Sequence, residues 1–156
     1  MYAEGEFLDF LIKAKRATYA SRGDDASVTP LLEGSRQLEF REGHFLYRDI
    51  YFGMRFFAGQ EVVYYKGNPI WSMCYSGGVE KDSDIEFARK VYAFLRKAMR
   101  NVDAENPFRG PEEYIEGDYV YRDSNEGGLD RFKGKETISF AGKVVYSLNY
   151  CGGFVR

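Results

Sequence analysis

Residues 39–49, Glu-Phe-Arg-Glu-Gly-His-Phe-Leu-Tyr-Arg-Asp, recur at residues 113–123 as Glu-Tyr-Ile-Glu-Gly-Asp-Tyr-Val-Tyr-Arg-Asp. Further along the chain, Trp71-Ser-Met-Cys-Tyr-Ser-Gly-Gly78 recurs as Tyr146-Ser-Leu-Asn-Tyr-Cys-Gly-Gly153. Many of the differences between the copies conserve side-chain shape. The spacing is 74 residues for the first string and 75 for the second, after one inserted residue near Gly128. A long repeat of this kind indicates that one structural unit occurs twice. We interpret it as a gene duplication followed by fusion.

The repeat divides the chain without a linker between its halves. We expect residues 1–156 to form a single domain, with repeat 1 at about 4–79 and repeat 2 at about 82–156. A chain of this length is typical of one domain and can bury a sizeable core without a metal or a disulfide.

A helical pattern precedes the strands of each repeat. Phe7, Phe10, Leu11 and Ala14 recur at helical spacing in the first. In the second, Ser83 followed by Glu86 predicts a capping box at the start of a helix.

Alternating runs with glycine between them predict hairpins in both repeats. We expect two-residue turns at Glu42-Gly43 and Glu116-Gly117, and further turns near Gly67 and Gly142. Counting four strands after each helix, we predict an α+β fold: an αβ4 unit of one helix and a four-stranded antiparallel sheet, present twice by internal duplication and related by a pseudo-twofold axis.

The first turn also predicts a register. With Glu42 and Gly43 as its central residues, Phe40 faces Phe45, and Glu39 lies diagonal to Arg48 on the other side of the sheet.

Charge and hydropathy exclude several classes of protein. The chain has 156 residues and a net charge of −2, and its pI near 5.6 argues against direct binding of nucleic acid. No apolar run approaches the ~20 residues that span a bilayer. Acidic residues at positions 4, 6 and 9 interrupt the N-terminal stretch that could resemble a signal peptide. We therefore expect a cytoplasmic protein with no membrane partner.

The sequence gives no sign of a metal or an organic cofactor. Cys74 and Cys151 lack zinc-like spacing, and His44 is the single histidine. No glycine-rich phosphate-binding pattern opens a helix. We expect no cofactor, and we assign no catalytic residue.

Two repeated arginines are candidates for ligand binding. Arg48 and Arg122 recur beside Glu39 and Glu113. The interpretation that we favour is a cross-strand ion pair in each copy. The alternative is that a pseudo-twofold axis brings the two guanidinium groups together to bind an anion.

Glu61 and Glu136 are more informative. Alternation places Glu136 on the same face as Ile138 and Phe140, and a carboxylate there must be paired or shifted in pKa. Arg48, Arg122 or a tyrosine hydroxyl could be its partner. Each glutamate is then either a structural anchor or a general acid/base at a pocket mouth. Together with Trp71 and the two arginines they form our predicted ligand-binding set: Arg48, Glu61, Trp71, Arg122 and Glu136.

An aromatic patch occurs in the first repeat only: Tyr51, Phe52, Met54, Phe56 and Phe57. It indicates a pocket wall, an interface or the seam between the halves. The long loop from Ser21 to Arg36 also belongs to this repeat alone and is typical of a lid or a contact surface.

The strings Tyr47-Arg-Asp49, Gly59-Gln-Glu-Val-Val-Tyr-Tyr-Lys-Gly67 and Trp71-Ser-Met-Cys-Tyr75 resemble an uncharacterised bacterial domain family. Members of that family occur alone or behind a helix-turn-helix module of the Xre type, a module that we do not expect in this chain. The resemblance covers nearly the whole sequence and brings no known activity. It implies ligand sensing or protein contact.

We therefore favour a non-enzymatic ligand-binding or sensing domain, with a small molecule or a protein as its partner. One alternative is a small hydrolase or isomerase that uses Glu61 or Glu136. The other is an antitoxin-like protein-interaction module. The sequence does not predict an oligomeric state.

Overall fold

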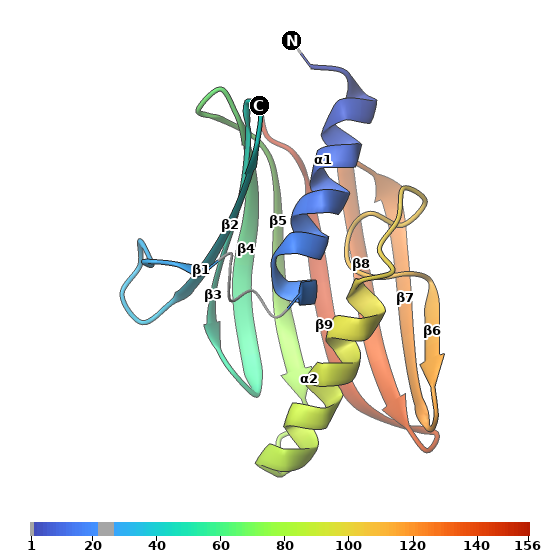
Figure 1. The fold of residues 1–156 in the computed structure, drawn as a ribbon. Helices are drawn as coiled ribbons and strands as arrows, with labels where there is room; N and C mark the ends of the chain where they lie inside the picture. Colours follow the sequence, from blue (N-terminus) through green and yellow to red (C-terminus); the bar gives the residue numbers. More distant parts are fainter. Residues whose placement is uncertain (1, 22–26) are drawn as a thin grey trace.

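The computed structural model describes residues 2–21 and 27–156, which form one sheet and two α-helices (Figure 1). The helical elements are α1 (Glu4–Ala17), the short 3₁₀ turn η1 (Tyr19–Ser21) and α2 (Ile85–Met99). The strands are β1 (Ser27–Val28), β2 (Arg36–Glu42), β3 (Phe45–Gly53), β4 (Phe56–Tyr65), β5 (Asn68–Val79), β6 (Glu113–Glu116), β7 (Tyr119–Gly128), β8 (Arg131–Phe140) and β9 (Lys143–Phe154). Residues 22–26 of the predicted long loop lie outside the described residues.

The predicted fold of two αβ4 units related by a pseudo-twofold axis is wrong. All strands belong to one antiparallel sheet of nine strands, in the order β1-β2-β3-β4-β5-β9-β8-β7-β6. β5 pairs with β9 from Trp71↔Phe154 to Val79↔Tyr146. An open sheet edge exposes unpaired backbone N–H and C=O groups, and this pairing satisfies them where two separate units would each leave an edge. β1 is a further strand that the sequence did not predict.

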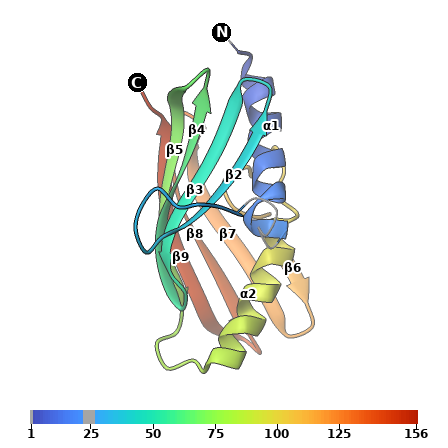
Figure 2. The same ribbon diagram turned by 60° about the vertical axis from the view of Figure 1, so that its left-hand side comes forward.

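Both helices cover the same face of the sheet, and the opposite face carries no helix (Figures 1 and 2). We call these the inner and the outer face. Phe7, Leu11 and Ala14 of α1 are buried as their spacing predicts. α2 likewise buries an apolar stripe against the sheet. The core lies between the sheet and this layer of helices.

The cap of α2 differs from the predicted capping box. The N-cap is Asp84, not Ser83, and its carboxylate accepts a hydrogen bond from the Phe87 backbone N–H at 2.9 Å. Aspartate and serine are comparably good caps, so the sequence placed the helix start correctly to within one residue.

The first hairpin turn also shifts by one residue. β2 ends at Glu42 and β3 begins at Phe45, so the turn is Gly43-His44, with Gly43 at φ +57°. A type II′ turn takes glycine at its first central position, whereas the sequence analysis had placed it second. As a result Phe40 pairs with Tyr47, and Glu39 lies directly opposite Arg48.

The turns near Gly67 and Gly142 are confirmed. Lys66-Gly67 and Ala141-Gly142 connect their strands with positive φ at both residues, as a type I′ turn requires. In the described part of the chain, neither helix has the length and apolar character needed to cross a membrane.

Candidate functional site

The inner face of the sheet and the segments that cover it hold an unusual number of buried charged side chains. Lys15, Asp49, Glu61, Arg109, Asp123 and Glu136 are all at most 5% exposed. Burial of a charge is costly unless the group is paired or changes its protonation state. Each group therefore needs a partner or a shifted pKa.

Glu136 has three partners and is fully buried. Arg109 Nη2 donates to its Oε1 at 2.7 Å, and the hydroxyls of Tyr121 and Tyr146 donate to its two oxygens, each at 2.7 Å. The prediction that Glu136 is buried and satisfied, with tyrosine among its partners, is confirmed. Its cation is Arg109, which the sequence analysis missed.

Glu61 is paired with a residue of α1. Lys15 Nζ lies 2.5 Å from Glu61 Oε2, and both side chains are buried. Burial lowers the pKa of Lys15, and the adjacent Glu61 opposes that shift. Like Glu136, Glu61 is bound within the interior, where its carboxylate holds a helix against the sheet.

A cavity on the inner face lies beside α2, over β2–β5, and has a volume of about 380 Å³. We call it the α2 pocket. Its lining comes from η1, β2–β5, the turn between β3 and β4, α2 and the segment after α2: Tyr19, Arg36, Leu38, Asp49, Tyr51, Gly53, Met54, Arg55, Phe57, Tyr75, Ile85, Ala88, Arg89, Tyr92, Arg96 and Arg109. Tyr51, Met54 and Phe57 of the aromatic patch thus form part of a pocket wall.

Positive charge dominates this lining. It contains five arginines and, among the described residues, a single acid, Asp49. Arg89 is paired with Glu86 at 2.7 Å, but at the exposed surface. Arg109 is 3% exposed, and its Nε has no hydrogen-bond partner within the described residues. A pocket with this charge, in a chain of net charge −2, favours an anionic ligand.

Asp49 has an unusual environment. The hydroxyl of Tyr75 donates to its Oδ1 at 2.6 Å. Burial, and next the nearby Glu61, raise the pKa of Asp49 to about 7, although Tyr75, Arg109 and Lys15 favour its charged form. Asp49 can therefore gain or lose a proton near neutral pH, which is typical of functional sites.

The structure divides the predicted ligand-binding residues between the two faces of the sheet. Glu61, Trp71 and Glu136 lie on the inner face. Arg48 and Arg122 alternate with buried residues and lie on the outer face. Four strands separate β3 from β7, so the two guanidinium groups do not meet.

Each of these arginines instead forms a local ion pair. Arg48 Nη2 lies 2.7 Å from Glu39 Oε1, and Arg122 Nε lies 2.9 Å from Glu113 Oε2. These are the cross-strand pairs that the sequence analysis favoured.

Trp71 belongs to the core. It is fully buried and stacks on Phe132 with ring centroids 5.5 Å apart. The ammonium group of Lys15 lies 5.8 Å from the Trp71 ring centroid. Trp71 thus supports the Lys15–Glu61 pair and does not line the α2 pocket.

Asp49, Tyr75 and Arg109 are the site residues that the sequence analysis missed. A signal existed for Asp49: it ends the repeated Tyr-Arg-Asp string, and alternation places it on the same face as Tyr47. Arg109 gave no such signal, because it lies in an irregular segment between α2 and β6.

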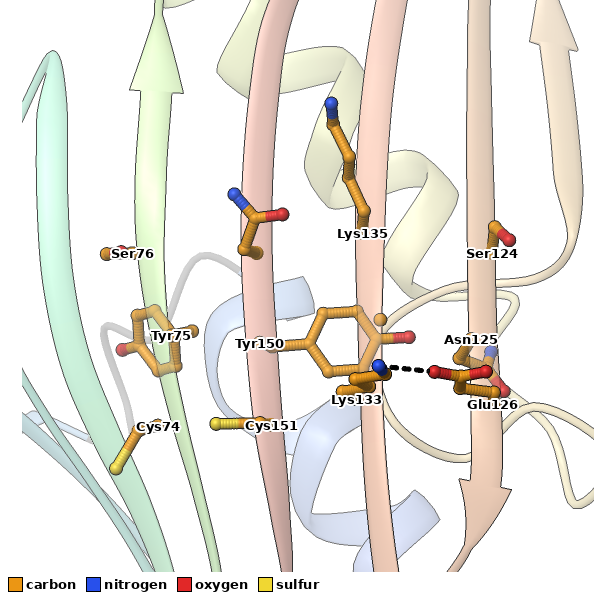
Figure 3. Close-up of a pocket in the computed structure, with 12 residues that line it drawn as sticks. Cys74, Tyr75, Ser76, Ser124, Asn125, Glu126, Lys133, Lys135, Tyr150 and Cys151 are labelled. Carbon is orange, nitrogen blue, oxygen red and sulfur yellow. Dashed lines mark ion pairs between the residues drawn. The ribbon is translucent and has the colours of Figure 1, made fainter.

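A second, shallower hollow of about 700 Å³ lies across β5, β9, β8 and β7 (Figure 3). Cys74 and Cys151 lie directly opposite each other on β5 and β9 there, both as exposed free thiols. Lys133 forms an exposed ion pair with Glu126 at 2.6 Å. This hollow includes neither Arg109 nor Asp49, so the α2 pocket is the stronger candidate.

Comparison with known proteins gives one match. Residues 49–155 match the model of a family described as a domain of unknown function (DUF5680). No curated protein and no solved structure matches the chain. The matched range begins at Asp49 and includes Tyr75 and Arg109.

Proposed function

The chain belongs to the family described as a domain of unknown function, and because that description gives no activity, we propose from the geometry that the protein binds a small organic anion in the α2 pocket. The observation that carries this proposal is Arg109. Its guanidinium is buried and satisfies Glu136 through one nitrogen, while its Nε has no partner among the described residues. Arg109 also lines the pocket, so its positive charge adds to that of the other four arginines there and favours an anion.

The other arginines extend this positive surface. Arg36, Arg55 and Arg96 line the same cavity. Of these, Arg55 donates through Nη1 to the backbone carbonyl oxygen of Ser83 at the long distance of 3.4 Å. Guanidinium groups bind carboxylates and phosphates through paired N–H donors, so either kind of anion fits.

The walls indicate the rest of the ligand. Tyr51, Phe57, Tyr75 and Tyr92 present aromatic surface to the cavity. The volume of about 380 Å³ lies within the range of small-molecule sites. We therefore expect an anion that carries an apolar, planar portion and not a bare inorganic ion.

Binding of this kind fits a sensing role. The proposal includes a cytoplasmic location and a bacterial origin for the protein. It also includes a relation to proteins with an Xre-type DNA-binding module, which the family resemblance described above supports. Near the β3–β4 turn, Met54 lines the pocket, and Phe52 and Phe56 expose their side chains on the outer face. This exposed apolar surface next to a pocket residue supports a protein partner that reads the bound state.

Calorimetric titration with phenyl phosphate, benzoate and inorganic phosphate tests the proposal. We expect the two aromatic anions to bind the protein and inorganic phosphate to bind much more weakly. Arg96→Gln should weaken the binding of phenyl phosphate about tenfold. Arg131→Gln is the matched control, because Arg131 is exposed on the outer face, and it should bind like the parent. The proposal is contradicted if neither phenyl phosphate nor benzoate binds the protein. It is also contradicted if the Arg96 and Arg131 variants bind phenyl phosphate equally well.

One observation favours a catalytic alternative. Asp49 lies in the pocket, and its pKa of about 7 suits a general acid or base. A carboxylate-dependent hydrolase or isomerase would then use Asp49, and not Glu61 or Glu136, which are paired in the interior. Under this alternative Asp49→Asn abolishes turnover of a bound ester or enolisable anion while leaving its affinity within a few fold.

A further inference from the structure

The inner face carries two aspartate–tyrosine pairs with similar surroundings. Tyr75 donates to Asp49 at 2.6 Å, and Tyr150 donates to Asp123 at 2.9 Å. Each tyrosine ring packs over a glycine. A Cβ atom on Gly59 would lie 2.4 Å from the Tyr75 hydroxyl oxygen, and one on Gly134 would lie 2.3 Å from the Tyr150 ring.

A phenylalanine accompanies each pair. The ring centroids of Phe57 and Tyr75 are 6.0 Å apart, and those of Phe132 and Tyr150 are 6.1 Å apart. We call these groups the Asp49 site (Asp49, Tyr75 and Phe57) and the Asp123 site (Asp123, Tyr150 and Phe132).

The chain itself fills the Asp123 site. Asn106 Nδ2 donates to Asp123 Oδ2 at 2.9 Å. Phe108 stacks on Phe132 with ring centroids 4.0 Å apart and an interplanar angle of 20°. The segment between α2 and β6 thus supplies an amide N–H donor and a planar ring, two residues apart.

At the Asp49 site, no described residue supplies an amide donor, and Phe57 packs against Tyr92 and Tyr146 with ring centroids 6.0 and 6.5 Å away. Within the described part of the chain, Tyr75 is the only side chain that donates to Asp49. Of the described residues that follow α1, Tyr19 of η1 lines the α2 pocket, and β1 pairs with β2 at the edge of the sheet. Asp49, Tyr75 and Phe57 all line the open α2 pocket, whereas Asn106 and Phe108 cover the corresponding residues of the Asp123 site.

We propose that the pocket ligand supplies to Asp49 and Phe57 what Asn106 and Phe108 supply to Asp123 and Phe132: an N–H donor beside a planar ring. With the arginines of the pocket, this defines a small aromatic or heteroaromatic anion that bears an amide or amine group. The inference rests on the proposed function, since it names the ligand class of the same pocket.

Because the hydrogen-bonding character of Asp49 changes with its protonation, the preference for ligands with an N–H donor depends on pH. An ionised carboxylate only accepts hydrogen bonds, whereas a carboxylic acid also donates. The titratable and charged groups around Asp49 are Glu61, Tyr75, Tyr47, Lys15 and Arg109. Ligands with an N–H donor are therefore preferred above the pKa of Asp49, and the preference shrinks below it.

Two probes of equal shape test the inference: 4-carbamoylbenzoate, which has an amide NH₂, and 4-acetylbenzoate, which has a methyl group in its place. By calorimetry at pH 8 we expect the carbamoyl probe to bind about tenfold more tightly, because a site built to pair with an N–H rejects an analogue that lacks it. At pH 6 the preference should fall.

Asp49→Asn should reduce the preference at pH 8 to about twofold or less and remove its pH dependence. Asp123→Asn is the matched control, because it changes the same residue type at the filled site, and it should keep the preference. Circular dichroism of both variants verifies that they fold.

The outcomes separate the two proposals. Equal affinity for both probes, or a preference that Asp49→Asn leaves intact, overturns this inference while anion binding stands. Binding of neither probe overturns the proposed function with it.

Discussion

Asp49 and Asp123 keep their protons to a higher pH than free carboxylic acids do, and this affects the stability of the folded protein. Burial is the main cause that raises the pKa of Asp49 to about 7 and that of Asp123 to about 6. In the unfolded chain both titrate near ~4. At pH values between the unfolded and the folded pKa of each group, the folded state binds more protons than the unfolded state. The stability that both groups contribute therefore falls as the pH rises through this window.

We therefore expect the free energy of unfolding to be lower at pH 8 than at pH 5. Asp49→Asn should reduce the difference, because the amide does not titrate. Urea unfolding of parent and variant at both pH values measures the effect. A variant whose loss between pH 5 and pH 8 equals that of the parent would show that Asp49 is not the group responsible.

Glu136 offers a second test at the scale of one residue. Glu136→Leu leaves Arg109 buried without its counter-charge, and loss of one partner from a buried ion pair costs ~3–5 kcal/mol. Glu136→Gln keeps the shape and an acceptor oxygen, so it should cost less. Glu113→Gln is the control: it removes an exposed partner of Arg122 and should cost less than ~1 kcal/mol. If Glu136→Leu melts like the parent, the ion pair does not stabilise the fold.

These residues show what alternation along a strand can predict. The alternation of apolar and polar residues correctly predicted the face on which Glu136 lies, because successive side chains of a strand point to opposite faces. It did not identify Arg109, because no periodicity describes the irregular segment from which that side chain comes. The same limit applied to the α2 pocket, whose lining comes from several separate segments.

At the scale of an element, the start of α2 depends on one side chain. Asp84→Ala removes the hydrogen bond to the Phe87 N–H and should lower stability by about 1 kcal/mol. Ser83→Ala is the neighbouring control and should be nearly neutral, because Ser83 lies one residue outside the cap. Chemical unfolding of the two variants compares them. If Ser83→Ala lost more stability than Asp84→Ala, Ser83 would be the N-cap, as the predicted capping box requires.

The hairpins were predictable in number and place but not in register. Glycine marked every turn, yet its position within the turn decides which strand residues pair. The type II′ geometry at Gly43 put Phe40 opposite Tyr47 and not Phe45. A sequence with one glycine in a turn is compatible with both registers, so only the backbone conformation separates them.

At the scale of the whole molecule, the sequence did not reveal that both halves share one sheet. The strands that join them, β5 and β9, are far apart in the chain. Local patterns identify strands, whereas the pairing of distant strands depends on contacts that no short window contains. The aromatic core crosses the same boundary, since Trp71 of β5 stacks on Phe132 of β8. Both features predict that the halves unfold together.

Gly77 is the position at which this prediction is sharpest. A Cβ atom there would lie 2.2 Å from the backbone oxygen of Ser147 and 2.4 Å from the Cα of Leu148, so Gly77→Ala must push β5 away from β9. We expect a loss of roughly 1–3 kcal/mol, as for other overpacked sites. Gly128→Ala is the control, because a Cβ there meets nothing within 4 Å.

Two probes follow the unfolding of these variants: fluorescence of the single tryptophan, Trp71, and far-ultraviolet circular dichroism of the whole sheet. In a molecule with one shared sheet, Gly77→Ala lowers both midpoints equally and the two transitions stay coincident. If β5–β9 were only a contact between independent units, the tryptophan transition would separate from that of the remaining strands. Coincident transitions in the parent and in Gly77→Ala, with the control unchanged, are therefore the expected result for a sheet that folds as one cooperative unit.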